Sequence, residues 1–195
     1  MASTPTLYIL AGPNGSGKTT LARDLLPRGI KCLNFLNADL LAQGLSPLDP
    51  TASLMRAGRI LLHEFDHNVT NNISFGIETT LSGLTYLDRF RDAKEKGYRL
   101  VLFYIWLGSI ELSLDRIRDR VSKGGHDVSV TDVTRRFPRS IRHFFNHYRP
   151  IADEFTIFDN RNAAPIRIAY GTPSDETVFD STLYTELLSI YDQAD

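Results

Sequence analysis

The sequence predicts an α/β fold with a mainly parallel, five-stranded sheet, and three observations support this fold class. Short apolar runs alternate with segments of helical periodicity along all 195 residues. The first apolar run, residues 7–11, leads directly into a complete phosphate-loop motif. Hydrophobic residues make up 42% of the chain, which is enough for one core. We therefore expect one domain spanning residues 1–195.

The phosphate-loop motif, residues 12–19, fits G-x-x-x-x-G-K-[ST] without a mismatch and precedes a helix predicted from Thr19 to Leu26. Its glycines allow backbone N–H groups and the N-terminus of the helix to point at phosphate oxygens. Lys18 is expected to reach the β- and γ-phosphates, and the Thr19 hydroxyl to hold Mg²⁺. Thr20 stands where a dinucleotide-binding G-x-G-x-x-G motif needs glycine, so we expect a nucleoside triphosphate. The predicted nucleotide-binding residues are Gly12, Pro13, Asn14, Gly15, Ser16, Gly17, Lys18, Thr19 and Thr20.

The composition argues against several kinds of partner. The net charge is −1, from 22 basic and 23 acidic residues, so no overall field attracts nucleic acid or an anionic membrane. The single cysteine, Cys32, lies in an apolar run and is expected in the core. The sequence contains no basic leader and no apolar run of membrane length, which favours a soluble, cytoplasmic protein.

Asp39 follows the second predicted strand, residues 31–36. The carboxyl ends of parallel strands meet at one edge of a sheet, so this carboxylate is expected to face the same crevice as the phosphate loop. The alternative role for Asp39 is that of a helix N-cap.

A long helix predicted over residues 52–69 contains His63, Glu64 and His67, which match the zinc-protease pattern H-E-x-x-H. His143 and His147 form another pair one turn apart. Three fixed positions are easily met by chance, and a complete phosphate loop makes protease chemistry in the same small domain implausible. We interpret the pattern as a solvated helix face.

Glu78 and three hydroxyl residues follow the third predicted strand, residues 72–77, so polar groups gather at the same sheet edge. The alternative is a polar turn. Thr85 is expected to cap the next helix, which ends at Gly97. Residues 99–107 are the most apolar strand and are expected at the centre of the sheet.

Two helices that meet at Gly124-Gly125 predict a hinged lid over about residues 116–148. The first begins after Ser109, and the second covers residues 131–148. Their arginines are expected to bind a triphosphate. These are Arg116, Arg120, Arg135 and Arg136. The alternative is an exposed hairpin whose arginines are solvated or pair with acids such as Asp115 and Asp119.

A fifth strand is predicted at residues 154–158, followed by a turn at 160–162 that by its position could approach an adenine base. Residues 166–170 are a candidate edge strand. Residues 175–191 are predicted to form an amphipathic helix that packs on the domain.

Taken together, the motifs resemble the zeta toxin family of bacterial kinases, and the resemblance spans nearly the whole chain. The matching segments are the phosphate loop, Asn37-Ala38-Asp39, Ile77-Glu78-Thr79-Thr80-Leu81-Ser82-Gly83, residues 116–126 with Gly-Gly-His, and Asp159-Asn160. The resemblance implies a P-loop kinase-type three-layer fold with a helical lid. It also implies ATP-dependent phosphorylation of the 3′-hydroxyl of the amino sugar in UDP-N-acetylglucosamine, with Mg²⁺.

The resemblance further implies roles for single residues. Asp39 would be the general base and would contact the substrate, which agrees with the need for a carboxylate that accepts the hydroxyl proton. Glu78 and Thr80 would bind the sugar nucleotide. The lid arginines Arg120, Arg136 and Arg116 would bind the γ-phosphate, and His126 would stand where another member has arginine. Ser82 stands where some members have a substrate-binding arginine, and resembling systems include a small helical antitoxin as partner.

A nucleotide-dependent switch or binding module is the alternative function. Such a protein would need the phosphate loop but no acceptor crevice. The polar residues Asp39, Glu78 and Thr80 therefore favour the kinase.

Overall fold

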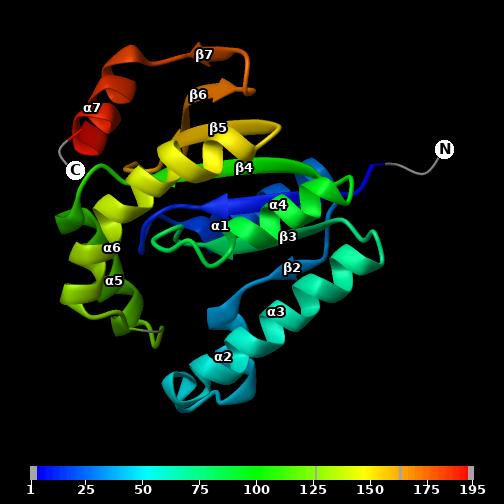
Figure 1. The fold of residues 1–195 in the computed structure, drawn as a ribbon. Helices are drawn as coiled ribbons and strands as arrows, with labels where there is room; N and C mark the ends of the chain where they lie inside the picture. Colours follow the sequence, from blue (N-terminus) through cyan, green and yellow to red (C-terminus); the bar gives the residue numbers. More distant parts are fainter. Residues whose placement is uncertain (1–3, 126, 163, 193–195) are drawn as a thin grey trace.

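Seven strands form one sheet in the computed structural model, which describes residues 4–125, 127–162 and 164–192. The strands are β1 (Thr6–Ala11), β2 (Phe35–Leu36), β3 (Phe75–Thr79), β4 (Arg99–Trp106), β5 (Glu154–Asp159), β6 (Ile166–Gly171) and β7 (Glu176–Val178). Their order is β2-β3-β1-β4-β5-β6-β7 (Figure 1). The first five strands are parallel, whereas β6 and β7 run antiparallel to their neighbours. The α/β class is confirmed. The sheet has two strands more than the five predicted: the candidate edge strand at residues 166–170 is confirmed as β6, and β7 was not predicted.

Helices cover both faces of this sheet. They are α1 (Lys18–Asp24), α2 (Ala38–Leu45), α3 (Leu54–Thr70), α4 (Leu87–Glu95), α5 (Ile110–Ser122), α6 (Val130–His143) and α7 (Ser181–Asp192). Two π-helical segments, Leu25–Ile30 and Phe144–Tyr148, extend α1 and α6, and short 3₁₀ segments cover Pro50–Ser53 and Arg149–Ile151.

Alternation along β1 divides the core between the two faces. Leu10 packs with Ala22, Leu26 and the buried Cys32 beneath α1. The next residue on the strand, Ala11, points to the larger cluster, to which α3, α4, α6 and α7 contribute. The result is the predicted arrangement of three layers.

The second strand is much shorter than predicted, and the reason lies in its partner. β3 begins at Phe75, so only Phe35 and Leu36 find a strand to pair with. Leu33, inside the predicted strand, is exposed. The helix α2 follows, with Asn37 rather than Asp39 as its N-cap: Leu40 N donates to Asn37 Oδ1 at 2.9 Å. The N-cap role for Asp39 was therefore wrong.

Tertiary pairing also shifts other boundaries. β3 continues through Thr79 because its last residues pair with Leu10 and Ala11 of β1, so Glu78 lies within the strand. The expected cap by Thr85 was wrong: α4 begins at Leu87 without a side-chain cap. The helix expected over residues 175–191 is divided because Glu176–Val178 pairs with β6 as β7 before α7 begins.

The second half of the predicted lid belongs to the core. Phe137, Ile141, Phe144 and Tyr148 are buried, and the ring of Tyr104 on β4 stacks on Phe144 at 4.3 Å between centroids. In Figure 1, α5 and α6 lie side by side at the left end of the sheet, and α2 and α3 lie below it, next to β2. No helix in the described ranges is both long and apolar enough to cross a lipid bilayer.

Candidate active site

The phosphate loop connects β1 to α1, and its shape depends on glycine. Gly12, Gly15 and Gly17 have φ angles of +143°, +75° and +87°. A Cβ atom at Gly12 would stand 2.2 Å from the carbonyl oxygen of Ile105, and one at Gly17 would stand 2.4 Å from Nδ2 of Asn160. Neighbouring elements therefore lie so close to the loop that only glycine fits at these positions, as the motif predicts.

Two side chains from distant elements hold the loop in place. Asn160, after β5, donates from Nδ2 to the carbonyl oxygen of Ser16 at 2.7 Å. The hydroxyl of Ser113 on α5 donates to the carbonyl oxygen of Asn14. From the sequence, Asn160 was expected near the base by its position alone, and Ser113 was not identified, because a single serine on a helix carries no motif.

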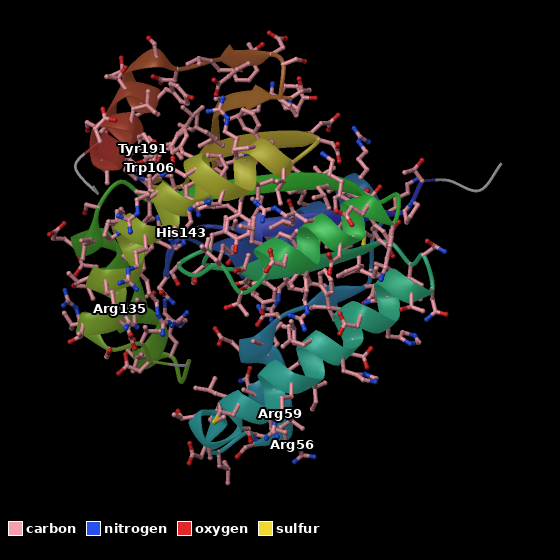
Figure 2. The ribbon with its side chains drawn as sticks, viewed as in Figure 1. Arg56, Arg59, Trp106, Arg135, His143 and Tyr191 are labelled. Carbon is pink, nitrogen blue, oxygen red and sulfur yellow. The ribbon has the colours of Figure 1, made fainter. Side chains whose placement is uncertain are left out.

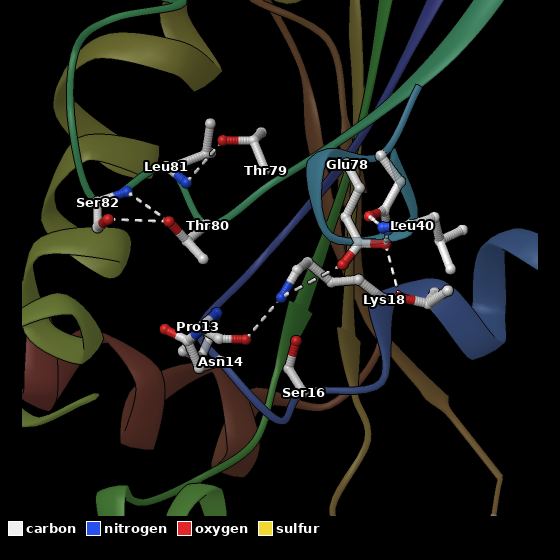
Figure 3. A network of polar contacts seen from close by, with 12 residues as sticks. Pro13, Asn14, Ser16, Lys18, Leu40, Glu78, Thr79, Thr80, Leu81 and Ser82 are labelled. Carbon is white, nitrogen blue, oxygen red and sulfur yellow. Dashed lines mark hydrogen bonds and ion pairs between the residues drawn. The ribbon is translucent and has the colours of Figure 1, made fainter. Parts of the chain in front are cut away.

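Lys18 is buried at the start of α1 (Figure 3). Its Nζ donates to the carbonyl oxygen of Pro13 at 2.8 Å and lies 4.0 Å from Oε1 of Glu78. Burial lowers the pKa of Lys18, while the nearby carboxylates of Glu78 and Asp39 oppose this effect. A phosphate group beside Nζ would stabilise the ammonium form in the same way.

Glu78 connects three parts of the site. Its Oε2 accepts hydrogen bonds from the Thr19 hydroxyl at 2.7 Å and from Nδ2 of Asn37 at 2.6 Å. Glu78 therefore joins the phosphate loop, α1 and the N-terminus of α2. Sequence reasoning predicted Glu78 and Thr19 as site residues but missed Asn37, which is 4% exposed and both caps α2 and orients Glu78.

Two adjoining cavities meet at these residues. The larger, about 820 Å³, is lined by the phosphate loop and α1, by α5 and by the turn after β5. The smaller, about 210 Å³, contains Asp39, Thr80 and Tyr86. Five residues line both cavities, namely Gly15, Lys18, Thr19, Glu78 and Arg120. The predicted loop residue Thr20 lines the larger cavity, and Asn14 lines the smaller one.

The predicted lid arginines have different surroundings. Arg120 lines both cavities, and its Nε and Nη2 atoms are buried without a hydrogen-bond partner in the described part of the chain. Arg116 lines only the larger cavity. Arg136 lines neither, and its nearest acid is Asp132 on the same helix at 3.5 Å. The exposed Arg135, labelled in Figure 2, also pairs with Asp132. His126 lies outside the described residues.

Thr80 lies in a loop that accepts hydrogen bonds from α6 and from the π-helical segment after it. Its hydroxyl lies 2.8 Å from the hydroxyl of Ser82, as Figure 3 shows. Between them, Leu81 is buried and has a φ of +52°. His143 Nδ1 donates to the carbonyl oxygen of Leu81 at 2.9 Å, and the Tyr148 hydroxyl donates to that of Gly83 at 2.8 Å. This loop forms one wall of the smaller cavity.

The histidines of the H-E-x-x-H pattern, His63 and His67, are exposed on α3. In the described ranges, no three or more His, Cys, Asp or Glu side chains are grouped to hold a metal ion. A cation at the phosphate loop would take ligands of another kind, the Thr19 hydroxyl and phosphate oxygens.

The cavities fit a nucleoside triphosphate and its Mg²⁺. Arg120 presents unpaired donors, Lys18 presents a buried ammonium group, and the cradle is too tight at Gly17 for a side chain. Thr19 and Glu78 are the residues that would hold the ion, directly or through its water.

No family model matches this sequence. The chain is 34% identical over 126 residues to an uncharacterised protein of Haemophilus influenzae, an alignment that covers 65% of this chain and 88% of that protein.

Solved structures that share this fold include the following three. AvrRxo1-ORF1 in complex with AvrRxo1-ORF2 has a TM-score of 0.75 at 18% identity over 97% of this chain, which spans 65% of the length of that chain. A structure of the PezAT toxin–antitoxin system of Streptococcus pneumoniae has a TM-score of 0.64 at 18% identity, over 99% of this chain and 86% of the other. A gluconokinase from Sinorhizobium meliloti has a TM-score of 0.52 at 13% identity, over 97% and 93%.

The phosphate loop, the strand order and the helix pair α5 and α6 thus occur together in this chain, which shares its fold with these solved structures over 97% to 99% of its length. The chain belongs to one family with the Haemophilus influenzae protein, and its fold is that of the zeta toxin-like P-loop kinases.

Proposed function

We propose that this protein is an ATP-dependent kinase that phosphorylates a hydroxyl group of a sugar nucleotide, UDP-N-acetylglucosamine. The observation that carries this proposal is the pair of cavities that share Lys18, Thr19, Glu78 and Arg120. A triphosphate in the larger cavity would end where the smaller one begins. An acceptor in the smaller cavity would then meet the γ-phosphate.

Asp39 is the proposed general base. It lies on the first turn of α2, is exposed, and lines only the smaller cavity. As the acceptor oxygen forms its bond to the γ-phosphorus, the bond from that phosphorus to the β–γ bridging oxygen breaks and ADP leaves. The acceptor proton passes to the Asp39 carboxylate.

Lys18 and Arg120 would neutralise the charge that spreads over the transferring phosphoryl group. Lys18 is buried, as are the Nε and Nη2 atoms of Arg120, and burial strengthens their interaction with an anion. Thr19 would hold a Mg²⁺ ion beside the phosphates, and the ion would neutralise part of their charge. Thr80 and Tyr86, which line the smaller cavity, would contact the acceptor.

The structural relatives support a toxin-like role with a protein partner. AvrRxo1-ORF1 has been solved with AvrRxo1-ORF2 and with ATP, and PezAT is a toxin–antitoxin system. We propose that a separate, small helical antitoxin inhibits this protein in the cell. A nucleotide-dependent switch is less well supported, because a switch has no use for a second cavity beside the phosphates.

The test is mass spectrometry of UDP-N-acetylglucosamine after incubation with the protein, ATP and Mg²⁺. The expected product carries one additional phosphoryl group. Asp39→Asn should slow its formation by about 10²–10⁴-fold, because the amide cannot accept the proton. Asp49→Asn is the matched control, since Asp49 is exposed and lines neither cavity, and it should act as wild type.

Two other outcomes would contradict parts of the kinase proposal. A wild-type rate in Asp39→Asn would remove Asp39 as the base. Release of ADP and inorganic phosphate without a phosphorylated product from any sugar nucleotide would favour the switch.

A further inference from the structure

Asn14 belongs to the phosphate loop but adjoins the proposed acceptor site and not the nucleotide site. It lines the smaller cavity and not the larger one, whereas Gly15, Lys18 and Thr19 line both. In the view of Figure 3, Asn14 lies on the same side of Lys18 as Thr80, which also lines the smaller cavity. Asn14 therefore stands on the acceptor side of the junction between the two cavities.

The side-chain amide of Asn14 is incompletely satisfied. Its Oδ1 atom is buried, and no group in the described part of the chain donates a hydrogen bond to it. A buried amide oxygen without a donor costs free energy, so such a group at the wall of a cavity indicates a ligand that supplies the donor. Rotation about the Cβ–Cγ bond of asparagine has a broad, two-fold energy profile, so the amide can turn either end toward that ligand.

The backbone at Asn14 is held independently of this side chain. The Ser113 hydroxyl on α5 donates to the Asn14 carbonyl oxygen. Nζ of Lys18 donates to the carbonyl oxygen of the preceding residue, Pro13, at 2.8 Å. These contacts set the position of the amide, and a variant with a shorter side chain at this position would keep them.

The chemistry of an amide indicates which group of the acceptor it would meet. The Asn14 side chain donates through Nδ2 and accepts through Oδ1, so it is complementary to another amide, which also has an N–H and a C=O group. In UDP-N-acetylglucosamine, an acetamido group stands on the ring carbon next to the one that carries the 3′-hydroxyl. With this hydroxyl between Asp39 and the γ-phosphate, the acetamido group would lie in the same cavity of about 210 Å³.

We infer that the Asn14 side chain binds the acetamido group of the acceptor, whose N–H donates to Oδ1, and so distinguishes N-acetylated sugars from sugars with a hydroxyl at that carbon. A hydroxyl group is smaller than an acetamido group and would leave the buried oxygen without its donor, which lowers affinity. The inference rests on the proposed kinase function and adds to it a residue that selects the acceptor.

The test compares two acceptors that differ only at this carbon, UDP-N-acetylglucosamine and UDP-glucose. Calorimetry with saturating ADP and Mg²⁺ measures their binding without phosphoryl transfer. The wild-type protein should bind the N-acetylated ligand about 10-fold more tightly, the range of one hydrogen bond. Asn14→Ala should bind UDP-N-acetylglucosamine about 10-fold more weakly and UDP-glucose less than 3-fold more weakly, so the preference should disappear.

Further measurements separate this role from a role in the fold or in nucleotide binding. Asn14→Ala should bind ADP as wild type does, and its urea denaturation midpoint should not fall, because the truncation removes a buried oxygen that lacks a donor. Asn14→Ser is a second truncation that should lose the same preference. Asn146→Ala is the matched control, because Asn146 is exposed, bonds with Tyr191 and lines neither cavity, and all three affinities should remain unchanged.

Equal binding of the two sugar nucleotides by the wild-type protein, or a preference that persists in both Asn14 variants, would overturn the inference while leaving the kinase proposal intact. A loss of ADP affinity as large as that of UDP-N-acetylglucosamine would assign Asn14 to the nucleotide instead. A wild-type protein that binds neither sugar nucleotide would overturn both proposals. Normal binding with the expected preference, but no phosphorylated product, would concern the kinase proposal alone.

Discussion

At the scale of single residues, Glu78 is the residue on which the site's geometry depends. Its side chain is 13% exposed, and that of Lys18 is 7% exposed. One carboxylate therefore offsets a buried ammonium group and at the same time accepts hydrogen bonds from Thr19 and Asn37. Removing a single partner from such a group is costly, because the remaining charge stays buried without compensation.

Glu78→Gln is expected to lower the free energy of unfolding by about 3 kcal/mol. The amide has nearly the same shape but no charge, so the pKa of Lys18 should fall further below its ordinary value. Urea denaturation at neutral pH measures the loss. Because ADP phosphates supply negative charge next to Lys18, saturating ADP should stabilise the variant relative to the ligand-free form.

Glu64→Gln provides the comparison on an exposed surface. Glu64 lies near His63 on α3 and its side chain is 46% exposed, so its loss should change stability by no more than about 0.5 kcal/mol. Equal stabilities for the two variants would show that Glu78 does not compensate Lys18.

At the scale of elements, the phosphate loop is shaped by the strand beside it. Ala11 of β1 pairs with Tyr104 of β4, and the chain then turns at Gly12 against the carbonyl oxygen of Ile105. The parallel register thus determines where the loop begins. A side chain at Gly12 meets fixed backbone, not a flexible neighbour.

Gly12→Ala should therefore destabilise the fold by about 2–4 kcal/mol, through both the contact and the positive φ. Gly124→Ala is a control for a positive φ without a steric contact, since Gly124 has a φ of +82° and open space around it. Its expected cost is about 1 kcal/mol. Chemical denaturation of the two variants would contradict the argument if their losses were equal.

At the scale of the whole molecule, α6 and the π-helical segment that follows it contact the loop around Thr80. His143 and Tyr148 bind two carbonyl groups of that loop, more than 60 positions away in the chain. Burial lowers the pKa of His143, and the charges of His147, Arg142 and Arg139 lower it further, against the opposing effect of the Leu81 carbonyl.

This depression of the pKa of His143 predicts a pH dependence of stability. In the unfolded chain the imidazole takes up its proton near the ordinary value of 6.5, whereas the folded protein resists protonation until lower pH. Stability should therefore fall as the pH drops below about 6.5 and level off once the folded form is also protonated.

Urea denaturation midpoints between pH 8 and pH 5 measure this dependence. His143→Asn retains a donor for the Leu81 carbonyl but does not titrate, so its midpoint should fall less than that of the wild type over this range. A curve with the same slope as that of the wild type would show that other groups cause the change.

The local patterns predicted well wherever the determining residues are contiguous. The phosphate loop, the central strand and the helix pair with its arginines were all found in this way. The predictions were wrong where strand pairing between segments far apart in the sequence sets the element bounds. β2 is short because β3 begins late, and β7 forms because β6 lies beside it. Ser113 carries no motif, and Asn37 was noted only as part of the segment 37–39, so their contacts with the site could not be predicted from local patterns.

The sequence by itself determined the α/β class, the triphosphate-binding loop and the candidates Asp39, Glu78 and Arg120, because periodicity and motif spacing are local properties of the chain. Only the tertiary structure decided which of these residues meet. Glu78 contacts Thr19 across 59 positions, and Arg116 contacts Arg161 across 45. The parallel register of β1, β3 and β4 and the packing of α5 against the turn after β5 bring these groups together, and no pattern within a segment specifies such distances.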